Sequence, residues 1–140
     1  MPEDKQQHYM KILSTNNSKH VYFVGDYANE KVLEFYKNNH VDVFINVSSI
    51  EGLSVALMEA GSFGITLMAT DINGTAEIVN KQSGYLLPIE FDVTEATEII
   101  KKIHSDNNYQ KRDTAREMYL ERFDADKNFT QFVEKIKTLT

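Results

Sequence analysis

Residues 41–64, VDVFINVSSIEGLSVALMEAGSFG, carry the clearest fold signal in this 140-residue chain. It opens with a nearly continuous apolar run, Val41–Val47, which is typical of a strand in a parallel sheet covered on both faces. A loop with Gly52 follows, and Leu53–Phe63 then has the composition of a helix packed between other layers. Burying the carboxylate of Glu59 in such a helix is costly unless that carboxylate is paired or hydrogen-bonded. The Glu59 carboxylate is therefore expected to have a binding partner, in the protein or in a ligand.

The rest of the chain alternates short apolar runs with helical segments. Further strands are expected at Lys19–Gly25, Ile65–Ala69 and Tyr85–Leu87, and further helices at 3–17, Asn29–Asn39, 75–80, 94–105, 109–122 and 125–138. Strands separated by helices through short connections predict an α/β, Rossmann-like parallel sheet with helices on both faces. We expect a single domain over residues 1–140, with a helical C-terminal extension over about 94–140.

Composition excludes several classes of function. The net charge is −6 and no basic stripe is present, so no nucleic-acid partner is expected. Cysteine is absent, which rules out disulfides, zinc–thiolate sites and thiol catalysis, and the 4 histidines lack the spacing of metal ligands. The N-terminus lacks the apolar core of a signal peptide, and no transmembrane segment is visible. The expected compartment is the cytoplasm.

The loop Ser48–Ser54 is well placed to bind a ligand. Parallel sheets bind ligands beyond the carboxyl ends of their strands, where loops lead into helix N-termini. The amides of residues 52–55 at the start of the expected helix, which Ser54 is placed to cap, suit a phosphate or diphosphate. Glu51 would repel a bare phosphate, so we expect it to accept hydrogen bonds from hydroxyl groups attached to that phosphate.

Glu59 lies about five residues into the helix, roughly 8 Å along its axis from the start. A carboxylate there can accept two hydrogen bonds from a vicinal diol such as a ribose. Hydroxyls, phosphates and a diol in this order correspond to a nucleotide sugar. The alternative is structural: Glu59 pairs with a lysine of a neighbouring helix, and Glu51 is a solvated loop acid.

The run Val41–Pro88 resembles the C-terminal domain of family 4 retaining glycosyltransferases, which have the two-domain GT-B architecture. The similarity includes the family's pattern of two glutamates separated by seven residues. It continues through ITLMATDINGTAEIV (65–79) and ends in SGYLLP (83–88). KHVYFVGDY (19–27) also looks like the strand and loop that precede this core in the family.

The resemblance implies roles for the residues that match. Glu51 would be the catalytic-site acid that holds hydroxyls of the donor sugar and orients the anomeric carbon. The amides of Gly52 and Leu53, with Ser54 beside them, would lie against the diphosphate, and Ser48 would flank that pocket.

The resemblance also implies a nucleotide subsite and a reaction. Glu59 would bind the ribose diol, and Tyr27 would lie against the nucleotide base. The reaction would transfer a glycosyl unit from a nucleoside-diphosphate sugar to an acceptor with retention at the anomeric carbon. It would use no metal or other cofactor, because protein charges stabilise the leaving diphosphate. Polysaccharide biosynthesis is the setting that the resemblance suggests.

The chain departs from the family at its N-terminus. The family's C-terminal domain opens with a strand and a loop whose Arg and Lys grip the diphosphate, whereas residues 1–18 are polar and helix-like. The N-terminal acceptor domain has no counterpart either. We therefore expect a truncated part of a longer enzyme that is inactive in isolation and, with an open sheet edge, prone to self-association.

Three other interpretations stay open beside the glycosyltransferase. The chain could be a non-catalytic nucleotide-binding module, part of a nucleotide-sugar epimerase of the same fold, or a structural domain whose two glutamates bind nothing. The run Asp124–Asp126 has the form of the acidic metal motif used by the other main glycosyltransferase fold. It falls between two expected helices, so Asp124 is better interpreted as a helix N-cap.

Overall fold

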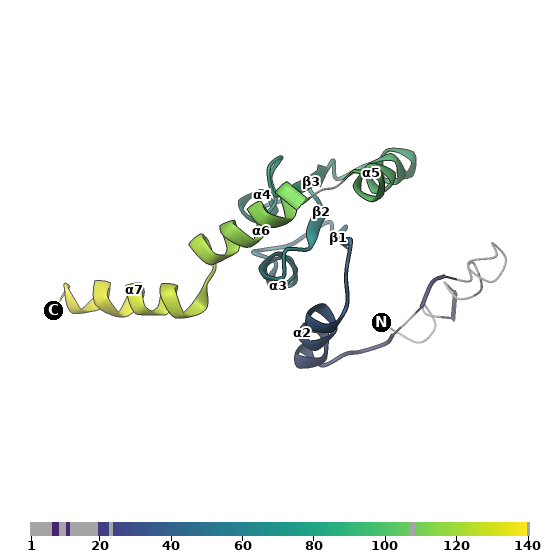
Figure 1. The fold of residues 1–140 in the computed structure, drawn as a ribbon. Helices are drawn as coiled ribbons and strands as arrows, with labels where there is room; N and C mark the ends of the chain where they lie inside the picture. The colour runs from purple at the N-terminus through teal and green to yellow at the C-terminus, as the bar shows by residue number, and fades with distance from the viewer. Residues whose placement is uncertain (1–6, 9–10, 12–19, 23, 107–108, 140) are drawn as a thin grey trace. The chain divides into compact units, whose positions relative to one another are not determined.

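The computed structural model describes residues 7–8, 11, 20–22, 24–106 and 109–139 (Figure 1). The chain forms two compact units, Met1–Phe35 and Tyr36–Thr140. Helix α2 (Asn29–Asn38) spans the division between them and has no buried residue. All the strands assigned in the described residues belong to the second unit.

A three-stranded parallel sheet forms the centre of the second unit. Its strands are β1 (Val43–Asn46), β2 (Thr66–Thr70) and β3 (Gly84–Leu87), and they lie in this order. In the register Asn46 lies opposite Ala69. Every residue of β2 is buried, as expected for a central strand covered on both faces. The three strands predicted over residues 41–87 are therefore confirmed, with ends that differ from the prediction by at most two residues.

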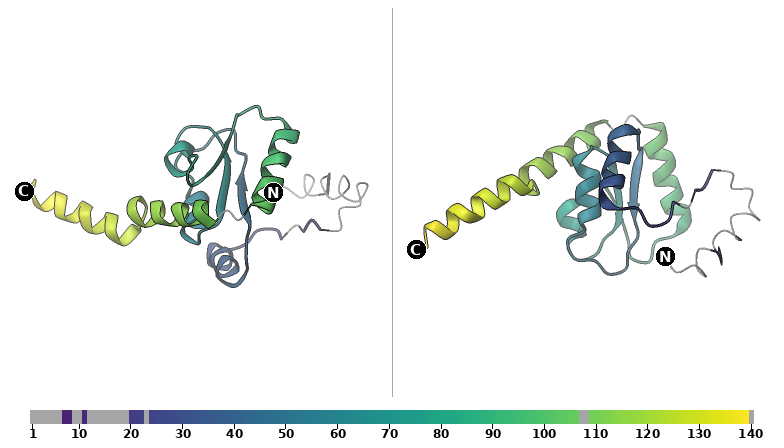
Figure 2. Two further views of the ribbon diagram at one scale, coloured as in Figure 1. Left: turned by 45° about the horizontal axis from the view of Figure 1, so that its top comes forward. Right: turned by 90° about the horizontal axis from the view of Figure 1, so that it is seen from below.

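Helices connect and cover these strands. Helix α3 (Val55–Ser62) joins β1 to β2, α4 (Thr75–Ile78) joins β2 to β3, and α5 (Val93–Ser105), α6 (Tyr109–Arg122) and α7 (Ala125–Lys137) follow. Helices α3 and α6 cover one face of the sheet, and α5 lies on the opposite side (Figure 2). The predicted Rossmann-like α/β architecture is confirmed.

The core lies between β2 and the two helices on its first face. Leu57 and Ala60 of α3, Leu67 and Ala69 of β2 and Ala115 of α6 are all buried in one cluster. Leu67 and Ala69 share a strand face because side chains alternate along a strand. This packing holds β2 against α3 and α6.

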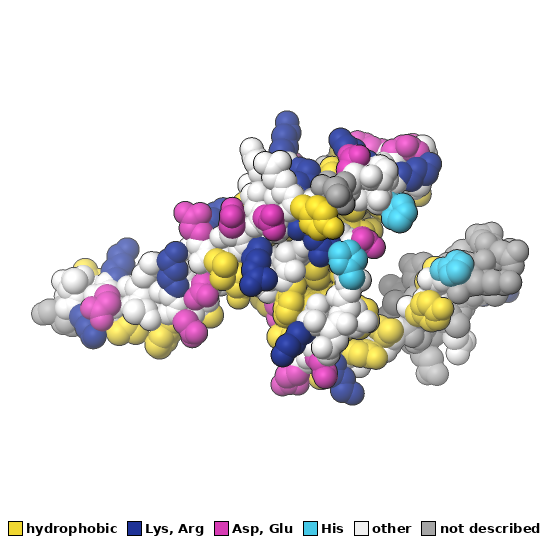
Figure 3. All heavy atoms as spheres, viewed as in Figure 1, with side chains coloured by type: hydrophobic (Ala, Val, Ile, Leu, Met, Phe, Trp, Pro, Cys, Tyr) yellow, Lys and Arg dark blue, Asp and Glu magenta, His cyan; other side chains and the backbone are white. Residues whose placement is uncertain are grey.

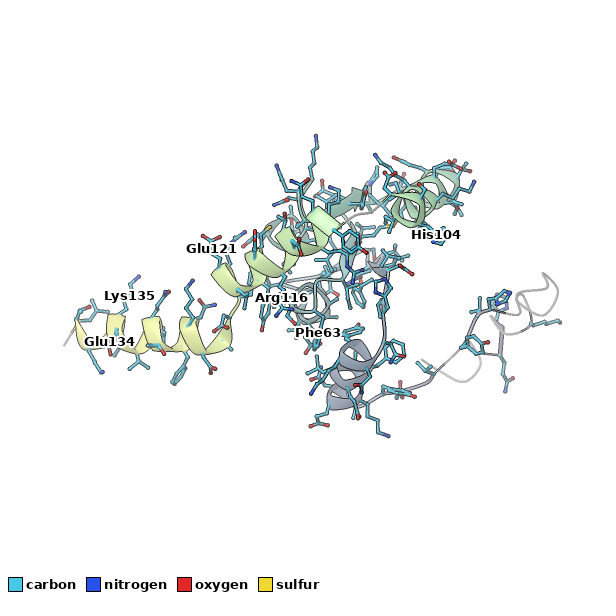
Figure 4. All side chains as sticks on the ribbon, in the orientation of Figure 1. Phe63, His104, Arg116, Glu121, Glu134 and Lys135 are labelled. Carbon is cyan, nitrogen blue, oxygen red and sulfur yellow. The ribbon has the colours of Figure 1, made fainter. Side chains whose placement is uncertain are left out.

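Three aromatic rings pack beside this core, close to the C-terminal end of α3. The ring of Tyr36 lies 5.7 Å from that of Phe63 and 6.4 Å from that of Phe44, centre to centre. Phe63 follows the last residue of α3 and is labelled in Figure 4. The rings bring Tyr36 against α3, which also carries Glu59.

The strand predicted at Lys19–Gly25 is not found in the part of that segment that the structure describes. Residues 20–22 and 24–25 have no strand conformation, and Gly25 has a φ of 71°. A β-rich run becomes a strand only where a neighbouring strand pairs with its backbone, and composition cannot report that pairing. The helix predicted at 3–17 falls largely outside the described residues.

Helix α7 ends the chain with no residue buried. Phe129, Phe132 and Ile136 are 69%, 61% and 46% exposed, and apolar side chains gather along one side of this helix (Figure 3). The helix begins as predicted, because the carboxylate of Asp124 accepts a hydrogen bond from the Lys127 amide at 2.8 Å. Among the described residues, none of the helices is both long and apolar enough to cross a bilayer.

Candidate functional site

A cavity of about 530 Å³ opens beyond the carboxyl ends of the strands. Its lining comes from the segments that follow each strand: residues 49–51 after β1, residues 71–74 with Ala76 after β2, and Ile89 after β3. Loops at this edge of a parallel sheet are where such folds bind ligands. Three residues of the loop predicted to bind a ligand, 49–51, thus line this cavity.

The lining combines acidic and amide groups with branched apolar side chains. Its polar side chains come from Ser49, Glu51, Asp71 and Asn73, and its apolar ones include Ile50, Ile72 and Ile89. No Lys or Arg stands among the described residues that line it. Two carboxylates without a cation repel a phosphate, whereas neutral hydroxyl groups can donate to them. The cavity therefore suits an uncharged group with several hydroxyls.

The loop that carries Glu51 is held by Asn46, the last residue of β1. The Asn46 side-chain amide donates from Nδ2 to Glu51 Oε1 at 3.3 Å. Its Oδ1 accepts from the Ser48 amide at 3.0 Å and from the Ser48 hydroxyl at 2.7 Å. Ser48 Oγ also lies 3.4 Å from Glu51 Oε1. Glu51 is thus held in place by the protein itself.

Two contacts from β2 and the turn after it hold the same loop. The Thr70 hydroxyl donates to the carbonyl of Ser48. Gly74 has a φ of +81°, and a Cβ placed there would lie 2.5 Å from the carbonyl oxygen of Gly52. Only glycine permits both this backbone conformation and this close approach. The turn with Asp71 and Asn73 is therefore pressed against the Glu51 loop, and together they form the cavity wall.

Ser54 occupies the N-cap position of α3, but the prediction that its side chain caps the helix is wrong. The Ser54 side chain makes no cap hydrogen bond, and the residue is only 4% exposed. Its hydroxyl instead accepts a hydrogen bond from Asn46 Nδ2 at 3.2 Å. Serine is a common N-cap residue, but here its hydroxyl is hydrogen-bonded to Asn46 at the end of β1.

Glu59 lies in different surroundings from Glu51. It is half-buried in α3 and is not among the residues that line the cavity. Its charge acts on Tyr36: burial, together with the negative charge of Glu59, raises the pKa of the Tyr36 hydroxyl. Of the predicted site side chains, the structure brings Glu51 to the cavity and places Glu59 beside an aromatic group.

The other predicted residues lie as follows. Ser48 is half-buried in the Asn46 network, and Gly52 and Leu53 are exposed just ahead of α3. Tyr27 belongs to the first unit, where the ammonium of Lys31 lies 5.9 Å from the centre of its ring. The roles predicted for these residues toward a diphosphate and a base stay predictions.

The sequence analysis did not single out Asn46. The run Asp71–Gly74 reads in the sequence mainly as a turn at a strand end, near the expected cleft, and its residues were not assigned to the site. The available signal for Asn46 was a lone amide at the carboxyl end of an otherwise apolar strand. In the described part of the chain, no three His, Asp or Glu side chains are grouped so that they could hold a metal ion. The expectation of a metal-independent reaction stays a prediction.

The family model described as glycosyl transferases group 1 matches residues 2–118. The chain belongs to this family. No curated protein matches it in sequence. The resemblance stated from the two glutamates and the segments around them is therefore confirmed at the level of the group 1 family.

Solved structures share the fold of this group 1 domain. Sucrose-phosphate synthase from Thermosynechococcus elongatus is 18% identical with a TM-score of 0.77, over 98% of this chain and 35% of that one. HepE of Anabaena, in complex with UDP-glucose, is also 18% identical with a TM-score of 0.77, over 98% and 38%. The C-terminal domain of the group 1 protein LpcC from Francisella tularensis is 16% identical with a TM-score of 0.73, over 89% and 66%. The chain thus spans about a third of the length of the first two.

Proposed function

We propose that this chain is the donor-binding part of a glycosyltransferase that uses a nucleoside-diphosphate sugar and retains the anomeric configuration. The observation that carries the proposal is the cavity that Glu51 lines beside the start of α3. Membership of the group 1 family supports sugar transfer as the reaction. The proposal adds the donor class, the stereochemistry and the residues.

The sugar of the donor occupies the cavity in this proposal. Its hydroxyls donate to Glu51 and Asp71, and the apolar faces of Ile50 and Ile89 contact its C–H groups. The absence of a cation among the described lining residues favours a neutral sugar there over the diphosphate. Glu51 is the catalytic-site acid, because it contacts the sugar that is transferred.

The diphosphate lies outside the cavity, over the exposed residues Gly52 and Leu53. The amides of residues 52–55 and the dipole of α3 there supply positive potential without a side-chain cation. Glu59, further along the same helix, binds the ribose diol. Solved HepE structures with UDP and with UDP-glucose make these two compounds the natural first probes.

The acceptor is bound by a part of the protein outside this chain. This part of the proposal is supported by the share of sucrose-phosphate synthase that the chain matches, which is 35% of its length. The chain alone therefore binds the donor but does not transfer sugar, and no metal is needed because helix amides stabilise the leaving diphosphate.

The test uses the longest natural protein that contains this chain, supplied with nucleoside-diphosphate sugars and candidate acceptors. We expect nucleoside diphosphate to be released only when an acceptor is present. We also expect the product to carry the donor's anomeric configuration in its ¹H NMR spectrum. Inversion would contradict retention, and free sugar released without an acceptor would indicate an epimerase. Binding without turnover under all conditions would indicate a non-catalytic module.

A further inference from the structure

We infer that Asn46 is a positioning residue that aims the Glu51 carboxylate at the donor sugar. This inference rests on the proposed function, in which Glu51 holds sugar hydroxyls. Asn46 does not line the cavity, so it acts on the sugar only through Glu51.

Asn46 is well suited to hold the loop at several points. Both of its amide hydrogens have acceptors, because Nδ2 lies 3.3 Å from Glu51 Oε1 and 3.2 Å from Ser54 Oγ. Its Oδ1 accepts from the Ser48 amide and hydroxyl. One planar side chain therefore ties together Ser48, Glu51 and Ser54, at the start, middle and end of the loop.

The backbone of Asn46 gives this side chain a rigid base. It is the last residue of β1 and is paired with Ala69 of the fully buried strand β2. Groups held on sheet strands are placed more accurately than groups that depend on a loop alone. Glu51 is thus connected to the sheet by the Asn46 side chain as well as by the backbone of the loop.

The contact with Asn46 also gives the two carboxylate oxygens of Glu51 different roles, one toward the protein and one toward the ligand. Oε1 accepts from Asn46 and lies near the Ser48 hydroxyl, whereas no described residue donates to Oε2. Oε2 is therefore the oxygen that receives a sugar hydroxyl. A glutamate without this contact would sample several rotamers and lose part of that preference for one orientation.

Only asparagine makes the full set of contacts at this position. An aspartate keeps an acceptor for Ser48 but, when ionised, has no hydrogen to donate, and it places a second negative charge beside Glu51. An alanine removes all the contacts and leaves the buried hydroxyl of Ser54 without the donor that it has now. Asn46→Asp therefore removes the donations to Glu51 and Ser54 but keeps the acceptor for Ser48, whereas Asn46→Ala removes every contact.

The experiment compares the affinity of the chain for a nucleoside diphosphate with its affinity for the corresponding nucleotide glucose. UDP, GDP and ADP and their glucose derivatives are titrated by calorimetry, and the pair that binds the wild-type chain is used for the variants. We expect Asn46→Asp to weaken binding of the nucleotide glucose by about tenfold or more, the scale of one hydrogen bond to a charged group. Its binding of the nucleoside diphosphate alone should weaken by a clearly smaller factor, because only the attached sugar contacts Glu51.

Asn80→Ala is the matched control. Asn80 Oδ1 also accepts from backbone amides, those of Gln82 at 2.9 Å and Ser83 at 3.1 Å, but Asn80 does not line the cavity. We expect this variant to bind both ligands like the wild type. Equal weakening of both ligands by Asn46→Asp and Asn46→Ala, with intact folding by circular dichroism, would make Asn46 merely structural and overturn the inference.

The remaining outcomes are also decisive. Unchanged binding of the nucleotide glucose by Asn46→Asp would overturn the inference and leave the proposed function standing. If the wild-type chain binds a nucleoside diphosphate but gains nothing from the attached glucose or another sugar, the cavity is not a sugar site. If it binds none of the nucleotides, the proposed function fails and the inference falls with it.

Discussion

Glu51 and Glu59 form one sequence motif, yet the structure gives them different surroundings. Glu51 lies in a loop that Asn46 holds by hydrogen bonds and Gly74 holds by close packing, and its carboxylate lines a cavity. Glu59 lies inside α3, half-buried, and its charge acts on Tyr36. Two acids at a fixed spacing in the sequence therefore need not bind the same part of a ligand. We propose the sugar for one and the ribose for the other.

The largest expected effect comes from Gly74→Ala, which breaks the Glu51 side of the comparison. The new Cβ would lie 2.5 Å from the Gly52 carbonyl oxygen at a φ of +81°, so backbone must move. We expect a loss of about 2–4 kcal/mol in the free energy of unfolding, measured by urea denaturation. Gly64→Ala is the control, because it has a φ of +65° but its nearest atom is 3.4 Å away. Equal losses for the two variants would mean that the contact with Gly52 is unimportant.

The next largest effect is expected from Glu51→Gln, on sugar transfer and on binding of the donor sugar. Glu51→Gln keeps the shape of the side chain but removes the charge that attracts sugar hydroxyls. In the longer enzyme we expect transfer to fall by about 100-fold or more, the scale of a lost electrostatic contact in an active site. In this chain, the extra affinity for a nucleotide sugar over the bare nucleotide should disappear. A variant that transfers sugar at the wild-type rate would remove Glu51 from the catalytic site.

Glu59→Gln should have a smaller effect on ligand binding than Glu51→Gln, and it should affect the bare nucleotide as well as the nucleotide sugar. If Glu59 binds the ribose, the substitution weakens binding of the bare nucleotide and of the nucleotide sugar by the same factor, about tenfold. Calorimetry on the same ligands as for Glu51 measures this. Weakening of the nucleotide sugar alone would mean that the two glutamates act on the same group after all.

The smallest effect is on the pKa of Tyr36, which burial and then the charge of Glu59 raise above the ordinary value of 10.0. The unfolded chain therefore releases this proton at a lower pH than the folded chain, and stability falls as pH rises above about 10. Glu59→Gln should lower the pKa of Tyr36 part of the way back, because burial remains. NMR titration of the ¹³C-labelled tyrosines measures the pKa of Tyr36 in both proteins. An unchanged pKa would mean that the charge of Glu59 does not act on the Tyr36 hydroxyl.

Much of the fold could be predicted because local patterns and packing agree. The apolar runs around residues 41–47, 65–69 and 85–87 became strands, and Asp124 caps α7 as its residue type suggests. The strand at Lys19–Gly25 could not be judged in this way, because a strand needs a pairing partner that composition does not reveal. The segment has the residues of a strand, but its described part does not adopt one.

The site was predicted less completely for a related reason. Glu51 and its loop follow from the rule that ligands bind at the carboxyl ends of parallel strands. Asn46, Asp71 and Asn73 were not assigned to the site, because their importance lies in contacts across β1, β2 and the turn at Gly74. Ser54 shows the same limit, since its hydroxyl is taken by a residue eight positions earlier.

The most direct test of the account is a comparison of amide chemical shifts in the ¹⁵N-labelled chain with UDP and with UDP-glucose, or with the nucleotide pair that binds. We expect both ligands to shift the amides of residues 52–55. We expect only the sugar-bearing ligand to shift the amides of Ser49, Asp71 and Asn73 in the cavity. Identical shifts from the two ligands would contradict the assignment of the Glu51 cavity to the sugar.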